Sequence, residues 1–208
     1  MAAHKNLLLF FLLFPNLIFG SQIGAASNST IEILAEDIIK TSEDTYLVGV
    51  KFRLDPGWHT YWINPGDSGE KASFEWKLPE GVKISNPKWP SPEIIPYPPL
   101  MTYGYNEEVT VLFNLTVERD LLSSEQIFLK SNWLACEDVC LPQSASIETT
   151  FLKIDDYKLS NKNSELLEKQ KKLPKKLPSS IKVLEEKGEI LLTGKVDSKL
   201  LNREVYFF

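Results

Sequence analysis

Hydrophobic and polar positions alternate with a period of two from residue 31 to about residue 153. In residues 46–54 every second side chain is apolar, and Lys51 and Arg53 fall on the opposite face. Because successive side chains of a strand point to opposite faces, each such run predicts a half-buried antiparallel strand. The positions that share a face are Tyr46, Val48, Val50, Phe52 and Leu54, then Val109, Val111, Phe113, Leu115 and Val117, and finally Ile147, Thr149 and Phe151.

Turn-forming residues separate the predicted strands, with Gly, Pro, Asn and Asp gathered at residues 55–57, 64–67 and 79–81. Several short strands with regular turns, and no long helical pattern, favour an all-β antiparallel sandwich over an α/β fold. Residues 87–99 hold six of the 13 prolines. Proline has no N–H to donate to a sheet, so this segment is expected to be an extended loop or an edge.

The composition changes after residue 153. Residues 154–180 are polar and lysine-rich, with a short helical pattern at 164–172 that Leu-Pro pairs bring to an end, and we expect a linker there. We expect residues 181–208 to begin a second, truncated β-domain, because three strands cannot build an independent core. The alternative is that they fold back on the first sandwich as extra strands. The strand-like runs are residues 181–184, 189–196 and 205–208.

The first 26 residues have the pattern of an export signal. Lys5 gives a positive start, residues 7–19 are apolar apart from Pro15 and Asn16, and Gly24-Ala25-Ala26 offers small residues for cleavage. An uncleaved membrane anchor is the alternative, but this run is shorter than the roughly 20 residues that a span needs. We expect a Sec-type signal peptide at 1–26 and a sandwich at 27–153 in the periplasm, where disulfides persist.

Composition and charge narrow the class of protein. The chain is 43% hydrophobic, enough for one good core, and its 23 basic and 28 acidic residues give a net charge of −5. The folded part carries no long basic stripe. Nucleic acid is therefore not an expected partner.

The two cysteines of the chain, Cys136 and Cys140, lie only four positions apart. On a straight strand that separation spans about 13 Å, whereas a disulfide needs Cα atoms within roughly 7 Å. If the pair is bonded, the chain must turn between the cysteines. A tight hairpin with one cysteine at the end of each strand fits the strand-like residues 126–135 and Pro142 better than one helical turn does.

A bridge across this pair has two interpretations. As a staple it closes only five residues, so its chain-entropy contribution is about 2 kcal/mol. As a redox pair, a short bridge at a hairpin tip is easy to reach and reduce. The residues alone leave both open. Glu137 and Asp138, between the cysteines, would disfavour a neighbouring thiolate and raise its pKa; alternatively, they only solvate the tip.

Four blocks of sequence, in order, carry a family resemblance: residues 57–69 (GWHTYWINPGDSG), Trp89-Pro90-Ser91-Pro92, Thr102-Tyr103-Gly104-Tyr105, and Cys136-x-x-x-Cys140-x-Pro142. The resemblance covers about residues 31–153. They resemble the N-terminal periplasmic domain of the DsbD-type disulfide reductases, nearest the branch of the suppressor-of-copper-sensitivity proteins.

The resemblance implies an immunoglobulin-like sandwich that works by dithiol–disulfide exchange, without a cofactor. It implies that Cys136 and Cys140 are the active pair, and that Met101, Thr102, Tyr103 and Gly104 form a cap loop over them. It also implies a transmembrane electron donor, and oxidised periplasmic thioredoxin-like or disulfide isomerase proteins as acceptors. Better-known members space their cysteines more widely, which leaves the partners of this chain open.

Two other functions are compatible with the sequence. Cys-x-x-x-Cys-x-Pro also resembles the copper-binding loop of the synthesis-of-cytochrome-oxidase proteins, where a distant histidine completes the site, and soft thiolates suit Cu(I). Those proteins have a thioredoxin fold, however, which the strand pattern does not fit, and His59 is more typical of a packing residue, so no metal site is predicted. The other function is a non-catalytic adhesion or assembly sandwich with a passive bridge.

Overall fold

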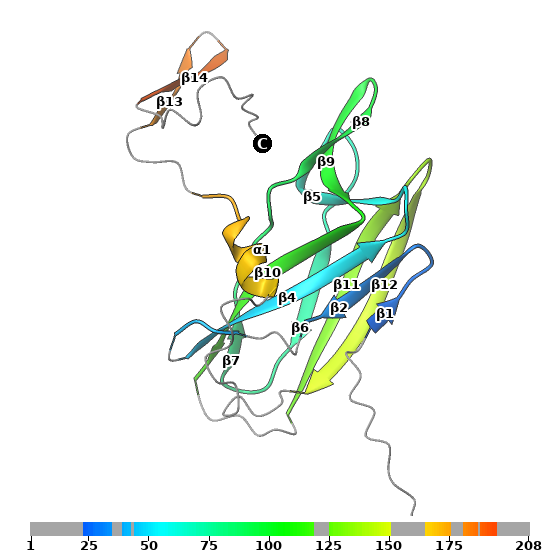
Figure 1. The fold of residues 1–208 in the computed structure, drawn as a ribbon, viewed down its shortest axis with the longest axis vertical. Coiled ribbons are helices and arrows are strands. Elements are labelled where there is room, and N and C mark those ends of the chain that lie inside the picture. Colours follow the sequence, from blue (N-terminus) through cyan, green and yellow to red (C-terminus); the bar gives the residue numbers. More distant parts are fainter. Residues whose placement is uncertain are drawn as a thin grey trace, which may run out of the picture.

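Two antiparallel sheets packed face to face make up most of the structure (Figure 1). This computed structural model describes residues 23–34, 39–42, 44–118, 125–150, 165–175, 181–186 and 188–194. The antiparallel β-sandwich expected from the alternating pattern is confirmed, and so is the immunoglobulin-like form that the family resemblance implied.

The first sheet has the order β1-β2-β4-β10-β7, with β3 also paired to β4. Strands β4 and β10 form its centre, and their register places Phe52 opposite Val109 and Val48 opposite Phe113. The strands are β1 (Ile23–Ala25), β2 (Ser29–Ile33), β3 (Ile39–Lys40), β4 (Thr45–Leu54), β7 (Val82–Ile84) and β10 (Glu108–Val117).

The second sheet has the order β12-β11-β5-β9-β8, with β6 also paired to β11. The proline-rich segment supplies β8 at the edge of this sheet, as its missing N–H donors require. The strands are β5 (His59–Gly66), β6 (Ser73–Lys77), β8 (Glu93–Tyr97), β9 (Leu100–Asn106), β11 (Gln126–Cys136) and β12 (Cys140–Thr150).

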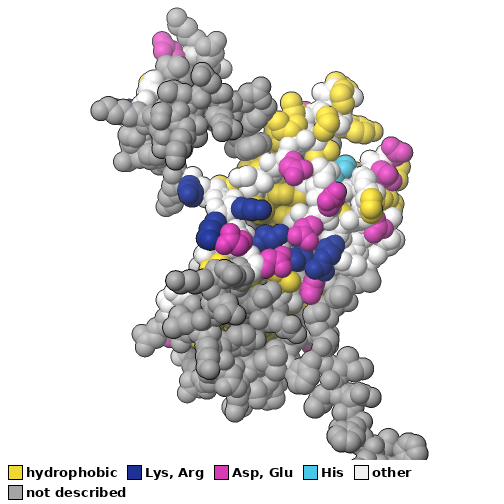
Figure 2. Space-filling model, viewed as in Figure 1, with side chains coloured by type: hydrophobic (Ala, Val, Ile, Leu, Met, Phe, Trp, Pro, Cys, Tyr) yellow, Lys and Arg dark blue, Asp and Glu magenta, His cyan; other side chains and the backbone are white. Residues whose placement is uncertain are grey.

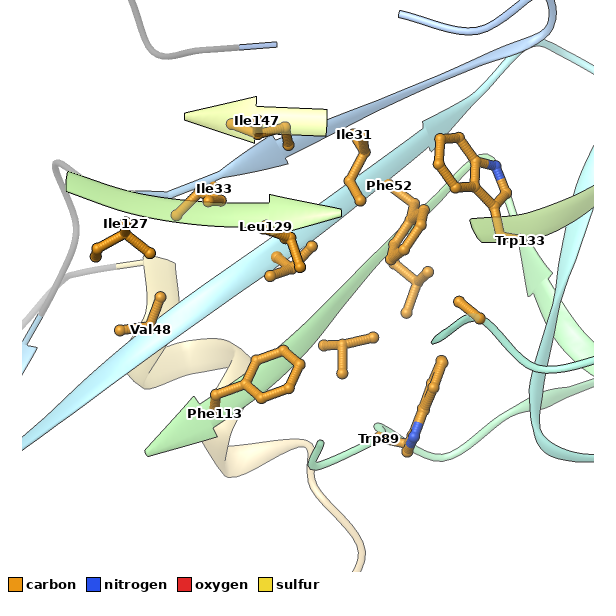
Figure 3. Close-up of a cluster of buried hydrophobic side chains, with 14 of the residues drawn as sticks. Ile31, Ile33, Val48, Phe52, Trp89, Phe113, Ile127, Leu129, Trp133 and Ile147 are labelled. Carbon is orange, nitrogen blue, oxygen red and sulfur yellow. The ribbon is translucent and has the colours of Figure 1, made fainter. Parts of the chain in front are cut away.

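The core lies between the two sheets and is rich in aromatic rings (Figure 3). Phe52 of β4 meets Trp133 of β11 edge to face, with ring centroids 5.4 Å apart, and Phe74 meets Phe113 at 5.1 Å. The indole N–H of Trp133 donates to the hydroxyl of Ser29 across the sheets. Since Trp133 is three residues before Cys136, this packing fixes the strand that carries the cysteines.

A helix covers the outer face of the first sheet. Helix α1 (Glu165–Lys171) places Leu166, which is fully buried, against Leu47 and Leu112. Gly49 makes room for it, because a Cβ there would lie 2.5 Å from the Leu166 side chain. Part of the segment expected to be a linker is thus packed on the sandwich, since an apolar patch on β4 and β10 needs a cover.

The helix also changes the environment of Lys51. The alternating pattern put Lys51 on the polar face, but the residue is only 4% exposed, and its ammonium lies 2.5 Å from the Glu165 carboxylate. Lys169 donates to Glu108, which lowers the pKa of Glu108. Figure 2 shows basic and acidic side chains mixed in one band across this face.

The sequence pattern predicted a signal peptide at residues 1–26 and the start of a second β-domain at residues 181–208. Strand β1 lies within the segment expected to be a signal peptide, where Gly24 pairs with Ile31 of β2; residues 1–22 lie outside the described residues. At the other end β13 (Lys182–Glu186) and β14 (Glu189–Thr193) form a two-stranded hairpin. The strand expected at 205–208 lies outside the described residues. Within the described ranges, no helix is long and apolar enough to cross a membrane.

Candidate functional site

A disulfide joins Cys136 at the end of β11 to Cys140 at the start of β12. The two cysteines are directly opposite in the strand register, and their Cα atoms are 4.1 Å apart. The tip between them is Glu137-Asp138-Val139, where the N–H of Glu137 donates to the carbonyl of Val139. The predicted hairpin, with one cysteine at the end of each strand, is therefore confirmed.

The two sulfur-bearing residues differ in exposure. Cys136 is 1% exposed and is paired through its backbone with His59 of β5. Cys140 starts the edge strand β12 and is exposed to solvent. A reactant arriving from solution can therefore reach Cys140 directly, while Cys136 lies behind it.

Tyr61 of β5 contacts both sulfurs. Its hydroxyl donates to Cys136 Sγ at 3.0 Å and lies 3.3 Å from Cys140 Sγ. The residue is 2% exposed, and burial, with a smaller effect from Tyr97, raises the pKa of its hydroxyl. The hydroxyl thus stays protonated near neutral pH and can donate to a sulfur anion.

A pocket of about 180 Å³ opens in front of the disulfide. Its floor includes Tyr61 and both cysteines, one wall is the β11–β12 tip, and the other is the β8–β9 hairpin. The lining residues are His59, Tyr61, Ser68, Gly69, Ile95, Tyr97, Leu100, Thr102, Cys136, Glu137, Asp138 and Cys140.

The four residues expected to form a cap loop lie within strand β9, not in a loop. Of these, Thr102 lines the pocket, whereas Met101, Tyr103 and Gly104 do not. The turn of this hairpin is at Tyr97–Leu100, and both end residues line the pocket. The part of this hairpin that lines the pocket thus begins just before the predicted cap, while the capping role itself stays a prediction.

Hydrogen bonds fix the β8–β9 hairpin to the turn that follows β5. The N–H of Met101 donates to the carboxylate of Asp67, and the N–H of Asp67 donates back to the Met101 carbonyl. The hydroxyls of Ser68 and Thr102 are 3.1 Å apart. Gly104 lets β9 approach β5 closely, because a Cβ there would lie 2.1 Å from the Thr60 carbonyl oxygen. The wall is therefore held in a defined position beside Tyr61.

The acidic residues between the cysteines are both exposed and line the pocket. Glu137 lies over Gly57, where a Cβ would approach its carboxylate oxygen to 2.8 Å. Neither Glu137 nor Asp138 forms an ion pair with a described Lys or Arg. Their negative charge therefore stays directed toward solvent beside the disulfide, as their proposed influence on the thiols requires.

His59 lies next to Tyr61, with ring centroids 5.4 Å apart in an edge-to-face arrangement. Burial lowers the pKa of His59, so its imidazole is neutral near pH 7. Among the described residues, His, Cys, Asp and Glu nowhere form a group of three or more that could hold a metal ion. The observed contact of His59 is ring packing against Tyr61.

Sequence reasoning missed the residues that contact the pocket from β5 and from the β8–β9 turn. Tyr61 was part of the quoted block at 57–69, and the period of two puts it on the same face as His59, beside the strand that ends at Cys136. That signal was available. No such signal existed for Tyr97 and Leu100, because they flank the turn at Pro98-Pro99, and a turn has no periodicity that shows toward which part of the molecule it folds.

The comparisons with known proteins agree with this arrangement. Residues 32–152 match the family described as thiol:disulfide interchange protein DsbD, N-terminal. No curated protein is similar enough to the sequence to count as a relative. The crystal structure of the N-terminal periplasmic domain of ScsB from Proteus mirabilis is similar at a TM-score of 0.54 and 20% identity, over 76% of this chain. The reduced N-terminal domain of Neisseria meningitidis DsbD gives a TM-score of 0.35 at 13% identity, over 62% of this chain and 85% of that one.

These structural matches differ in weight. At 20% identity the ScsB domain supports the fold alone, and this chain spans 58% of its length. The score of the Neisseria domain is too low to carry an argument. The family match carries the assignment, because it covers more than half of the chain and contains β3 to β12, with the disulfide and its pocket.

Proposed function

The chain belongs to the family of DsbD N-terminal thiol:disulfide interchange domains, and on that premise we propose that it is a periplasmic reductant carrier that works through Cys136 and Cys140. Thiol–disulfide exchange, an oxidoreductase activity, is the general activity of the family. In our proposal the domain receives electrons from a membrane donor and passes them to oxidised periplasmic proteins of the thioredoxin-like or isomerase type.

The observation that carries the proposal is the unequal exposure of the two cysteines above one shared hydroxyl. The reduced Cys140 thiolate attacks an oxidised partner, forms a mixed disulfide and displaces one partner thiolate. Cys136 then attacks the sulfur of Cys140 and displaces the second partner thiolate. The partner disulfide has gained two electrons, and the Cys136–Cys140 disulfide has formed again.

Tyr61 is placed to assist both steps. Its hydroxyl reaches either sulfur, so it can donate to whichever carries negative charge, and such a hydrogen bond favours the thiolate. Burial of Cys136 and the charges of Glu137 and Asp138 act in the opposite direction. Features that disfavour the thiolate in the free domain suit a carrier that must not react with every disulfide it meets.

The β8–β9 hairpin is the part of the site that controls access in this proposal. Tyr97, Leu100 and Thr102 line one side of the pocket, and the other three predicted cap residues belong to the same strand, β9. A docking partner would have to contact or displace that wall before its sulfur reached Cys140. The hydrogen bonds between Asp67 and Met101 would hold the wall in place when no partner is bound.

Trapping of the mixed disulfide tests the proposal. A Cys136→Ser protein keeps the attacking thiol and lacks the resolving one, so it should accumulate a one-to-one mixed disulfide with an oxidised thioredoxin-like substrate on non-reducing gels. A Cys140→Ser protein should accumulate none, because its remaining thiol is buried. Equal trapping by both variants would contradict the assigned roles, and the absence of exchange by the reduced wild type would refute the function.

The staple interpretation requires that the fold depends on the bridge for much of its stability. Strands β11 and β12 are already paired along their whole length, so the bridge adds only its entropic contribution of about 2 kcal/mol. The copper alternative gains no supporting observation, since the described residues contain no three-ligand group.

A further inference from the structure

One surface surrounds the exposed Cys140, and we call it the disulfide face; it consists of Tyr97, Leu100, Glu137, Asp138 and Val139. We infer that this face selects oxidised partners whose cysteine is flanked by basic residues and lies in an apolar surface. The inference rests on the exchange function proposed above and adds the class of substrate. Its two parts, apolar contact and charge, come from different side chains.

The apolar part is formed by two hairpin tips on either side of the pocket. Val139 on the β11–β12 tip is 63% exposed, and Tyr97 and Leu100 on the β8–β9 hairpin, which line the pocket, are 55% and 37% exposed. Figure 2 shows hydrophobic side chains gathered at this end of the molecule. Large exposed apolar side chains that border a reactive group are typical of a surface that a protein partner covers.

The charged part is acidic on the side that carries the cysteines. Glu137 and Asp138 line the pocket, and no Lys or Arg is among its lining residues. Lys51, Arg53 and Lys169 form their ion pairs on the α1 face, away from this pocket. A partner sulfur that approaches Cys140 therefore meets two uncompensated carboxylates, and complementary charge on the partner would raise the rate of encounter.

The size of the effect follows from the spacing. Asp138 is two residues from Cys140 and Glu137 three, so basic side chains next to a partner cysteine come within roughly 10 Å of both carboxylates. In water, one pair of opposite unit charges at that distance changes a rate or an equilibrium by a factor of about two. Two acids facing two bases form four such pairs, which together raise the rate by about tenfold at low ionic strength. Screening at physiological salt, with a Debye length of about 8 Å, reduces this to about twofold.

Synthetic disulfides test the inference directly. Three peptides of equal length carry one cysteine bonded to 2-thiopyridine, with the cysteine flanked on both sides by Arg, by Gln or by Glu. The reduced chain attacks the peptide sulfur and releases 2-thiopyridone, which is followed by absorbance. Resolution by the second thiol then releases the peptide thiol and leaves the protein disulfide, so each protein molecule loses two electrons.

The expected result is a rate about tenfold higher for the Arg peptide than for the Gln peptide at low ionic strength, falling to about twofold at physiological salt, with the Glu peptide slowest. The Glu137→Gln/Asp138→Asn protein should lose this preference. A matched control, Glu75→Gln/Glu148→Gln, removes the same charge from exposed positions on β6 and β12 and should keep it. Because a change in thiol pKa affects all three peptides alike, the ratio of rates isolates charge selection.

Each failure has its own meaning. Equal rates for the Arg and Gln peptides, or a preference that survives in the Glu137→Gln/Asp138→Asn protein, would overturn the inference and leave the exchange function standing. If the reduced wild type released no 2-thiopyridone from any peptide, the exchange function itself would be refuted, and the inference with it.

Discussion

Replacing Tyr61 by Phe removes a hydroxyl that contacts both sulfurs and keeps the buried ring. Hydrogen bonds to ionised groups contribute about 1.5–3 kcal/mol, and we take the lower end because sulfur is a weak acceptor. About 1.4 kcal/mol corresponds to a tenfold change in ionisation. We therefore expect Tyr61→Phe to raise the pKa of the reduced thiol that it contacts and to lower the thiolate fraction near neutral pH by about tenfold.

The rate should change less than the thiolate fraction. A thiolate from a weaker acid is a better nucleophile, with a Brønsted coefficient of about 0.4–0.5, which recovers about threefold. The net expectation is exchange about threefold slower at neutral pH, and about threefold faster well above the thiol pKa, where both proteins are fully ionised and only the difference in nucleophilicity remains. Alkylation by iodoacetamide as a function of pH measures the ionisation, and release of 2-thiopyridone from a neutral pyridyl disulfide measures exchange.

Tyr105→Phe is the matched control. The Tyr105 hydroxyl is also partly buried and donates to the Pro90 carbonyl at 2.7 Å, but its ring stacks on Trp89 and contacts neither sulfur. Both variants should lose about 1 kcal/mol of stability, and only Tyr61→Phe should change the pH profile. A Tyr61→Phe profile that coincides with that of Tyr105→Phe would refute the role given to this hydroxyl.

Three further predictions concern stability. Cys136→Ser should lower the free energy of unfolding by only about 2 kcal/mol in urea titrations; collapse of the fold would favour the staple. The folded-state pKa of His59 is lowered by burial, so the unfolded chain binds its proton more readily and stability should fall as the pH drops below about 6.5. The urea midpoint of the His59→Gln protein should therefore depend less on pH in that range, and a pH dependence equal to that of the wild type would count against this reasoning. Leu166→Ala, which empties a fully buried site, should cost about 2–3 kcal/mol and make residues 165–175 susceptible to protease without slowing exchange, whereas Glu168→Gln on the exposed side of α1 should do neither.

The alternating pattern was sufficient to predict the sandwich, because a period of two fixes which face of each strand is buried. It placed Phe52, Val109 and Phe113 in the core, where they lie. The prolines of residues 87–99 predicted an extended loop or an edge, and the structure has the edge strand β8 there. The hairpin at Cys136 and Cys140 also followed from local geometry, since a five-residue ring cannot close on a straight strand. These are short-range constraints, and the sequence alone carries them.

Long-range packing decided the rest. Nothing local shows that α1 would dock on β4 and bury Lys51, because that outcome depends on Gly49 and Leu166 meeting across more than a hundred residues. The β8–β9 hairpin is likewise positioned by Asp67 and the turn after β5. Both are contacts between elements that the sequence pattern describes separately.

The unequal exposure of the two cysteines is also a tertiary property. Cys136 and Cys140 are equivalent in the sequence as the two ends of one tip. Cys136 is buried because β11 pairs with β5 there and places the cysteine over Tyr61, whereas Cys140 begins a strand with a partner on one side only. The sequence by itself determined that these two sulfurs could bond, and the packing of β5 against β11 decided which of them faces solvent.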